Sequence, residues 1–140
     1  MHLKDELHTL VDIKAILNRA GIMPTQQRLE IARVMLSRPQ HLSAEQVLAL
    51  VNRADNLVSK ATVYNTLSLF AREGIVREVL VDPNRVFFDS NTDDHYHLYN
   101  EDTGTLTEVY ADCLLPDALP ALPEGTTLVG IDVVIRVRKA

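Results

Sequence analysis

The sequence predicts an α+β fold in which a winged helix-turn-helix domain, residues 1–89, precedes a small α/β domain, residues 90–140. Apolar residues recur at helical spacing as far as Gly74, and two β-branched runs then flank a turn. The last segment alternates apolar and polar residues with the period of a strand. With 140 residues and 46% hydrophobic content, two small cores are expected rather than a single large one.

Four helices are expected in the first domain. The first two run from Leu3 to Ala20 and from Pro24 to Ser37, as the spacing of their apolar residues indicates. Ser43 and Gln46 form a capping-box pair that begins a third helix. Because only residues 54–58 separate it from a fourth helix, these two helices predict a helix-turn-helix.

The fourth helix has Ser59 as its N-cap and ends at Gly74. Its apolar face carries Val63, Leu67, Phe70 and Ala71, and its opposite face carries Ala61, Asn65, Ser68 and Arg72. In a major groove, Asn pairs with adenine, and Ala or the edge of Tyr64 can contact a thymine methyl group. The same pattern also fits a helix whose polar face contacts only water.

Two β-rich runs follow this helix and predict a hairpin, the wing. They are residues 75–81 and 86–89, joined by the turn Asp82-Pro83-Asn84-Arg85. Arg85 at the tip can contact a DNA backbone or enter the minor groove, where negative potential is concentrated.

The second domain is expected to be rich in strands. Residues 95–100 and 105–110 predict a hairpin around the turn 101–104, and the prolines of residues 116–125 predict an irregular segment with at most a short helix. Residues 126–139 predict a further, half-covered strand.

Charge is divided unevenly between the two halves. Residues 1–88 hold 11 Lys and Arg against 9 Asp and Glu, which gives +2, whereas residues 89–140 hold 3 against 10, which gives −7; together they make the net −5. An acidic second half does not face phosphate, so any DNA contact belongs to the first half. The basic candidates there are Lys14, Arg19, Arg28, Lys60, Arg72, Arg77 and Arg85.

Neither a membrane span nor a disulfide is expected. No apolar run approaches the length needed to cross a bilayer, and the first ten residues are too polar for a signal peptide. We therefore expect a cytoplasmic protein without membrane partners. The single cysteine, Cys113, can form no internal disulfide and no four-cysteine zinc site.

Several motifs resemble the ferric uptake regulator (Fur) superfamily of metal-responsive bacterial repressors. They are Thr62-Val63-Tyr64, the segment His41-Leu-Ser-Ala-Glu45 and the continuation Gly74-Ile-Val-Arg77. Phe88-Asp89-Ser90-Asn91, the cluster His95-Tyr96-His97 and the C-terminal strand are more similar to its iron response regulator (Irr) branch, which is linked to iron and haem. The resemblance implies an iron- or haem-responsive repressor that dimerises through its second domain and binds palindromic operator DNA.

DNA contacts are expected on the fourth helix, on the wing and at Arg28, which matches the superfamily's T-x-x-R pattern. A dimer would read two half-sites spaced by about one helical turn or a multiple of it. The predicted contacts are Arg28, Lys60, Ala61, Thr62, Tyr64, Asn65, Ser68 and Arg85. As an alternative, Arg28 is an ordinary solvated side chain.

A metal site is the second expectation. His95 and His97 are two apart in a predicted strand, so both imidazoles project from one face and can share an ion. Alternatively, they face solvent beside an acidic turn. The resemblance implies the ligand set His41, Asp89, His95, His97 and Glu108, which suits Fe(II), Mn(II) or Zn(II). An ion held by these separate segments would set the spacing of two reading helices and so switch operator affinity.

Two departures from the superfamily limit what the ligands imply. The positions of its second metal site hold Asp94, Tyr96, Leu115 and Asp132, which predicts that this site is degraded or absent. The resemblance to the Irr branch also implies haem, with a haem-delivering protein as a partner and with His95, Tyr96 and His97 as the ligands. However, Tyr96 should point away from its two neighbours, and Cys113 lacks the following proline of a haem-regulatory dipeptide.

Two other functions remain open from the residues. One is a metal-dependent hydrolase with Glu108 or Glu101 as its base, although the chain has no nucleophile motif and the near-full ligand set leaves little room for substrate. The other is a metal-independent winged helix that binds a protein.

Overall fold

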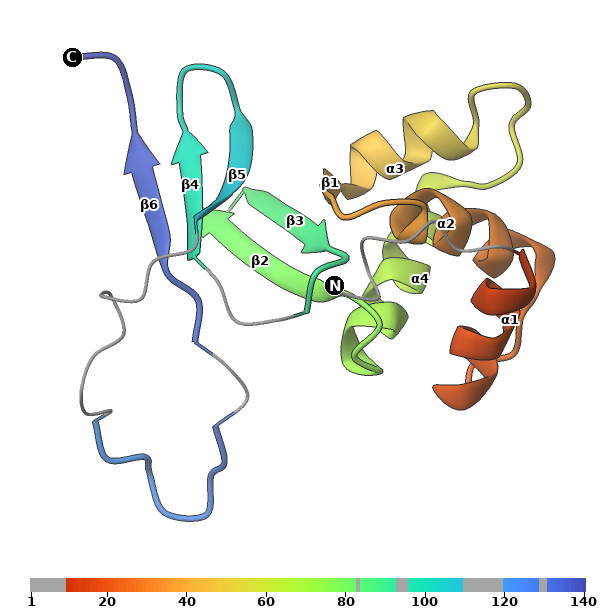
Figure 1. The fold of residues 1–140 in the computed structure, drawn as a ribbon, viewed down its shortest axis with the longest axis horizontal. Coiled ribbons are helices and arrows are strands. Elements are labelled where there is room, and N and C mark those ends of the chain that lie inside the picture. The colour runs from red at the N-terminus through yellow and green to blue at the C-terminus, as the bar shows by residue number, and fades with distance from the viewer. Residues whose placement is uncertain (1–9, 83, 93–95, 110–119, 129–130) are drawn as a thin grey trace. The chain divides into compact units, whose positions relative to one another are not determined.

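The computed structural model describes residues 10–82, 84–92, 96–109, 120–128 and 131–140. The chain divides into two compact units, Met1–Asp93 and Asp94–Ala140. The elements of each unit are labelled in Figure 1. The predicted α+β fold is confirmed, with helices and wing strands in the first unit and a separate sheet in the second. The sequence placed the domain boundary slightly earlier, after Asp89, and that placement stays a prediction.

Helices α1 (Leu10–Arg19) and α2 (Gln26–Leu36) form the base of the first unit. The Thr25 side chain caps α2 by accepting a hydrogen bond from the backbone N–H of Arg28. Their apolar faces meet in the core, where Ile13, Leu17, Ile31 and Met35 are buried. The part of the first predicted helix before Leu10 lies outside the described residues.

Helices α3 (Ala44–Val51) and α4 (Lys60–Arg72) form the predicted helix-turn-helix. The capping box at the start of α3 is present, with Ser43 and Gln46 bonded reciprocally, and Ser59 caps α4. Both starts were predicted correctly because each depends on residues only three apart.

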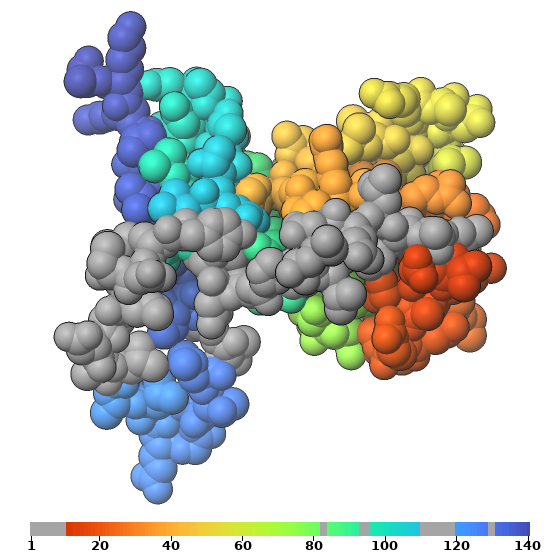
Figure 2. All heavy atoms as spheres, in the orientation of Figure 1, coloured from red at the N-terminus to blue at the C-terminus, as the bar shows by residue number. Residues whose placement is uncertain are grey.

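The loop between these helices is organised by one side chain. The Asn52 amide donates to the carbonyl oxygen of Val58 at 2.8 Å and accepts from the backbone N–H groups of Leu57 and Val58 at 2.9 and 3.1 Å. The loop residues 53–57 are exposed, and this segment is yellow in the surface view of Figure 2. Asn52 therefore supplies the polar partners that the loop backbone lacks.

The wing contains one strand more than expected. Strands β2 (Arg77–Asp82) and β3 (Arg85–Asp89) form the predicted hairpin, and β1 (His41–Ser43) adds to it in the order β1-β3-β2. Sequence reasoning placed His41 just ahead of a helix cap, because three residues show no strand periodicity. The pairing of β1 with β3 sets His41 opposite Asp89.

The second unit is a sheet with the order β5-β4-β6. The central strand β4 (Tyr96–Asn100) pairs antiparallel with β5 (Thr105–Val109) and parallel with β6 (Val134–Val137). In the turn after β4, the Asn100 side chain accepts hydrogen bonds from the backbone of Asp102 and Thr103. This is the predicted hairpin around residues 101–104.

The C-terminal strand is shorter than predicted. Of the described residues in this segment, Val134–Val137 forms a strand, whereas residues 126–128 and 131–133 have no regular structure. Alternation of apolar and polar residues shows which face a strand would present, but a strand also needs a partner, and β4 is only five residues long. Of the segment 116–125, predicted to be irregular with at most a short helix, residues 120–125 form no helix, and residues 116–119 lie outside the described parts. Of the helices that the structure describes, none combines the length and the apolar character needed to cross a membrane.

Candidate DNA-binding surface and metal ligands

One face of helix α4 is buried and the opposite face is exposed, as the sequence predicted. Val63, Leu67 and Phe70 are completely buried in the core of the first unit. The opposite face leaves Ala61, Asn65, Ser68 and Arg72 exposed. Because the apolar face fixes the helix against the core, the exposed face can enter a groove without unfolding.

The predicted DNA-contacting residues are not all equally accessible. Lys60, Ala61, Tyr64, Asn65 and Ser68 of α4 and Arg85 of the wing are exposed. The Thr62 hydroxyl accepts a hydrogen bond from Ser59 at 2.9 Å. The guanidinium of Arg28 donates to the carbonyl oxygen of Met23 at 3.0 Å, so it must leave this bond or share it to reach a phosphate.

Tyr64 and Lys60 share a partner that sequence reasoning missed. The Tyr64 hydroxyl donates to Glu45 Oε1 at 3.3 Å, and Lys60 Nζ lies 3.9 Å from the same oxygen. Desolvation, followed by the charge of Glu45 and the hydrogen bond to it, raises the pKa of Tyr64 above its ordinary value. The phenol therefore keeps its proton at neutral pH. Glu45 lies in the first turn of another helix, so no spacing pattern within α4 could have identified it.

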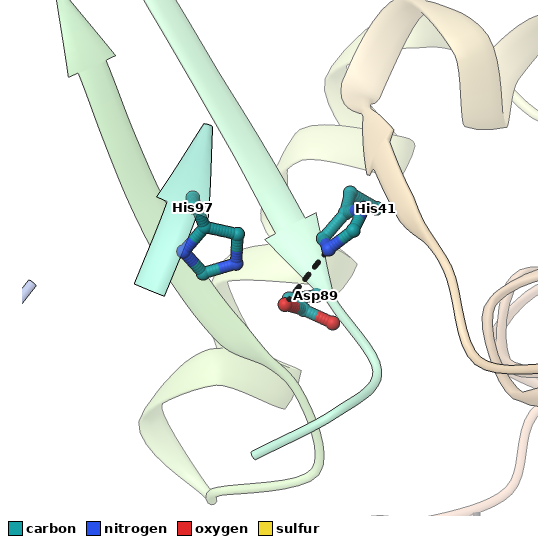
Figure 3. A group of neighbouring side chains, drawn as sticks. All are labelled: His41, Asp89 and His97. Atoms are coloured by element: carbon teal, nitrogen blue, oxygen red, sulfur yellow. Dashed lines mark ion pairs between the residues drawn. The ribbon is translucent and has the colours of Figure 1, made fainter. Parts of the chain in front are cut away.

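His41 and Asp89 form the first half of the candidate metal site. Their imidazole and carboxylate point toward one another in Figure 3, with His41 Nε2 and Asp89 Oδ2 3.3 Å apart. The His41 side chain is 13% exposed and that of Asp89 is fully buried. The other carboxylate oxygen of Asp89 accepts from the backbone N–H of Asn91 at 2.8 Å, which fixes its orientation. An imidazole nitrogen and a carboxylate oxygen are suitable ligands for a first-row divalent ion.

Residues next to this pair hold its two strands in register. The backbone N–H of Gln40 donates to the Ser90 hydroxyl at 3.0 Å, and that of Ser90 donates to the carbonyl oxygen of Gln40 at 3.1 Å. The Gln40 side chain donates to the carbonyl oxygens of Val34 and Met35 at the end of α2. The His41–Asp89 pair is therefore anchored to the helical core.

His97 and Glu108 form a second pair within the second unit. They are direct partners across β4 and β5, so their side chains project from the same face of the sheet. His97, also drawn in Figure 3, is buried, and Glu108 is half-buried. His95, the remaining predicted ligand, lies outside the described residues. Tyr96 is buried on the face of β4 opposite His97, which separates two of the three predicted haem ligands.

Comparisons with known proteins identify the family. The model of the ferric uptake regulator family matches residues 19–133. The chain belongs to the ferric uptake regulator family. It is a metal-responsive transcriptional repressor and not an enzyme, which excludes the hydrolase alternative. Proteins of this family bind operator DNA as dimers.

Individual relatives agree with this assignment. The peroxide-responsive repressor PerR of Staphylococcus epidermidis is 33% identical over 103 residues, which cover 74% of this chain and 69% of the relative. A ferric uptake regulator from Pseudomonas aeruginosa, solved with manganese, is 27% identical with a TM-score of 0.66 over 90% of this chain and 96% of that one. The Vibrio cholerae regulator is 25% identical with a TM-score of 0.71 over 91% and 100%. None of these three relatives is named for haem or belongs by name to the Irr branch.

Proposed function

We propose that this protein represses transcription as a dimer whose affinity for a palindromic operator is set by one divalent ion bound by His41, Asp89, His95, His97 and Glu108. Fe(II), Mn(II) and Zn(II) fit a set of imidazole and carboxylate ligands. The observation that carries the proposal is the His41–Asp89 pair, in which a buried carboxylate faces an imidazole nitrogen at 3.3 Å. The register pair His97 and Glu108 supports it independently within the second unit.

The proposed DNA contacts are Arg28, Lys60, Ala61, Thr62, Tyr64, Asn65, Ser68 and Arg85. Support comes from the exposed polar face of α4, which is backed by the buried side chains of Val63, Leu67 and Phe70. Asn65 is in a position to read adenine, and Lys60 and Arg85 to contact phosphate. Because the positive excess lies in residues 1–88, we expect the acidic second unit to make no DNA contact.

Three chemical signals are compatible with such a site, and they differ in what supports them. Manganese is present in the P. aeruginosa relative, and the S. epidermidis relative is named for peroxide. Haem is supported only by the sequence resemblance to the Irr branch, and the position of Tyr96 on the face of β4 opposite His97 counts against His95, Tyr96 and His97 sharing one iron. We propose a divalent metal as the resident ligand, with peroxide or haem as the signal that alters it.

Operator binding by the purified protein in defined ligand states tests the proposal. A duplex selected from a random pool would be titrated with metal-stripped protein, and then with protein carrying Mn(II), Zn(II), anaerobic Fe(II) or haem, at one fixed salt concentration. A second Fe(II) sample would be treated with peroxide. We expect a divalent metal to change the dissociation constant by about 10-fold or more, the range of typical allosteric coupling. The same affinity in every state would contradict the metal-responsive function, and no binding in any state would contradict the DNA-binding function.

A further inference from the structure

Glu45 occupies a position that neither the predicted metal site nor the predicted DNA contacts explain. It lies in the first turn of α3, exposed to solvent, yet its carboxylate contacts two side chains of α4. Those two, Tyr64 and Lys60, are among the residues that we propose contact DNA. Where the helix-turn-helix would meet a negatively charged duplex, an acidic side chain opposes binding.

We propose that Glu45 is a specificity-determining residue, which orients Tyr64 for base contact and restrains Lys60 from binding any phosphate it meets. This inference rests on the proposed DNA-binding function. The hydrogen bond to Glu45 Oε1 holds the Tyr64 hydroxyl on the α3 side of the reading helix. Directed this way, the ring presents its edge and not its hydroxyl to a thymine methyl group.

The same carboxylate limits non-specific binding through Lys60. At 3.9 Å the ion pair partly neutralises the ammonium group, and with the two side chains 64% and 61% exposed the pair is weak. DNA can therefore displace Glu45 from Lys60, but each contact between Lys60 and a phosphate then loses the free energy of this ion pair. At the correct operator sequence, favourable contacts with the bases offset this loss, whereas random DNA offers no such contacts.

A simpler role for Glu45 is to stabilise the start of its own helix. A carboxylate in the first turn of a helix interacts favourably with the helix dipole, whatever lies nearby. The two roles predict different outcomes for Glu45→Asp. Aspartate keeps the charge at the start of α3 but is one methylene shorter, so it should not reach Tyr64 and Lys60 together.

The test compares the dissociation constants of a selected duplex and a scrambled duplex over a series of salt concentrations. Glu45→Gln should tighten binding to scrambled DNA by about 3- to 10-fold, the scale of one weak ion pair released in each subunit. It should also steepen the dependence of affinity on salt, by about one unit of slope for each additional phosphate contact. The selected duplex should gain less, so the ratio of the two affinities should fall.

Three further variants decide the cause. Glu45→Asp should also lower the ratio if contact with α4 matters, and a ratio equal to that of the parent would overturn the proposal. In a Lys60→Ala background, Glu45→Gln should leave the salt slope unchanged, and a slope that still steepens would overturn the role of Lys60. Glu73 is an exposed glutamate at the other end of α4. Glu73→Gln removes the same charge and should leave the ratio of the two affinities unchanged.

The outcomes also distinguish this inference from the proposed function. If the parent discriminates between the duplexes and Glu45→Gln discriminates equally well, the inference is wrong and the DNA-binding function stands. If the parent binds neither duplex in any metal state, the proposed function fails and the inference fails with it. Circular dichroism and thermal melting would confirm that each variant retains the fold of the parent.

Discussion

At the residue scale, several local interactions hold Asp89, one of the proposed ligands, in place. It is fully buried, faces His41 and accepts a hydrogen bond from Asn91. It is also the register partner of Arg77 on β2. A buried carboxylate is costly unless it is paired, so several local interactions are needed to keep it in place.

Replacing Asp89 with asparagine should remove the metal ligand with little change in shape. The amide oxygen can still accept from Asn91, but the negative charge that attracts the ion is lost. We expect affinity for Mn(II), measured by isothermal titration calorimetry, to fall by at least about 100-fold, the upper end of what loss of an outer-shell partner costs. Glu78→Gln removes the same charge from an exposed site on β2 and should leave the affinity for Mn(II) unchanged. Undiminished affinity in Asp89→Asn would show that the ion binds elsewhere.

Sequence information identified candidate ligands better than it identified their surroundings. The likeness to the Fur superfamily pointed to His41 and Asp89, but no local pattern could, since strand pairing across nearly fifty residues brings them together. Gln40 and Ser90, which bond to each other beside the His41–Asp89 pair, were missed, and so was Glu45, which contacts Tyr64 and Lys60. Their contacts cross from one element to another, and such contacts have no periodic signature in the chain.

At the element scale, α4 is held at both ends by local chemistry. Ser59 caps its start, and Gly74 follows its C-cap with φ +76°. A residue with a Cβ atom disfavours this left-handed conformation, whereas glycine adopts it freely. Both ends were predicted from sequence because each depends on a single residue type at a single position. The three-residue strand β1 was missed and the last strand was predicted too long, because both depend on a distant partner.

Gly74→Ala should destabilise the first unit without disturbing its packing. A Cβ atom at Gly74 would meet nothing within 4 Å, so the cost is backbone strain alone, about 1–2 kcal/mol of unfolding free energy. Urea denaturation followed by circular dichroism would measure it. Glu73→Ala, at the neighbouring C-cap position where φ is −90°, serves as the control and should change stability by less than about 0.5 kcal/mol. Equal stability of Gly74→Ala and the parent would mean that the helix end relaxes.

At the scale of the whole molecule, the second unit leaves apolar surface available for a partner. Strand β6 lies at one edge of the described sheet, Val134 and Ile135 are only half-buried, and Ile131 and Val137 are 37% and 36% exposed. An edge strand with exposed apolar residues is normally covered in the native assembly. Because proteins of this family bind operator DNA as dimers, a second copy of the chain is the expected cover.

Val137→Lys should therefore weaken the proposed dimer. A charge in a buried interface typically costs about 1–3 kcal/mol, which raises the dissociation constant roughly 5- to 150-fold. Sedimentation velocity over a range of protein concentrations would measure the change. Thr107→Lys, which introduces the same charge at an exposed site on β5, should leave the dimer intact. If Val137→Lys dimerises as the parent does, β6 is not part of the interface.

The loop after α3 offers a practical site for a spectroscopic reporter. Because the Asn52 amide bonds to the backbone of Leu57 and Val58, we expect the exposed side chains of residues 53–56 not to be needed to hold the angle between α3 and α4. A fluorophore attached at Asp55, through a cysteine introduced there after Cys113 has been replaced by serine, should leave the reading helix in place. Its anisotropy would then follow operator capture in real time, in solution and without labelled DNA.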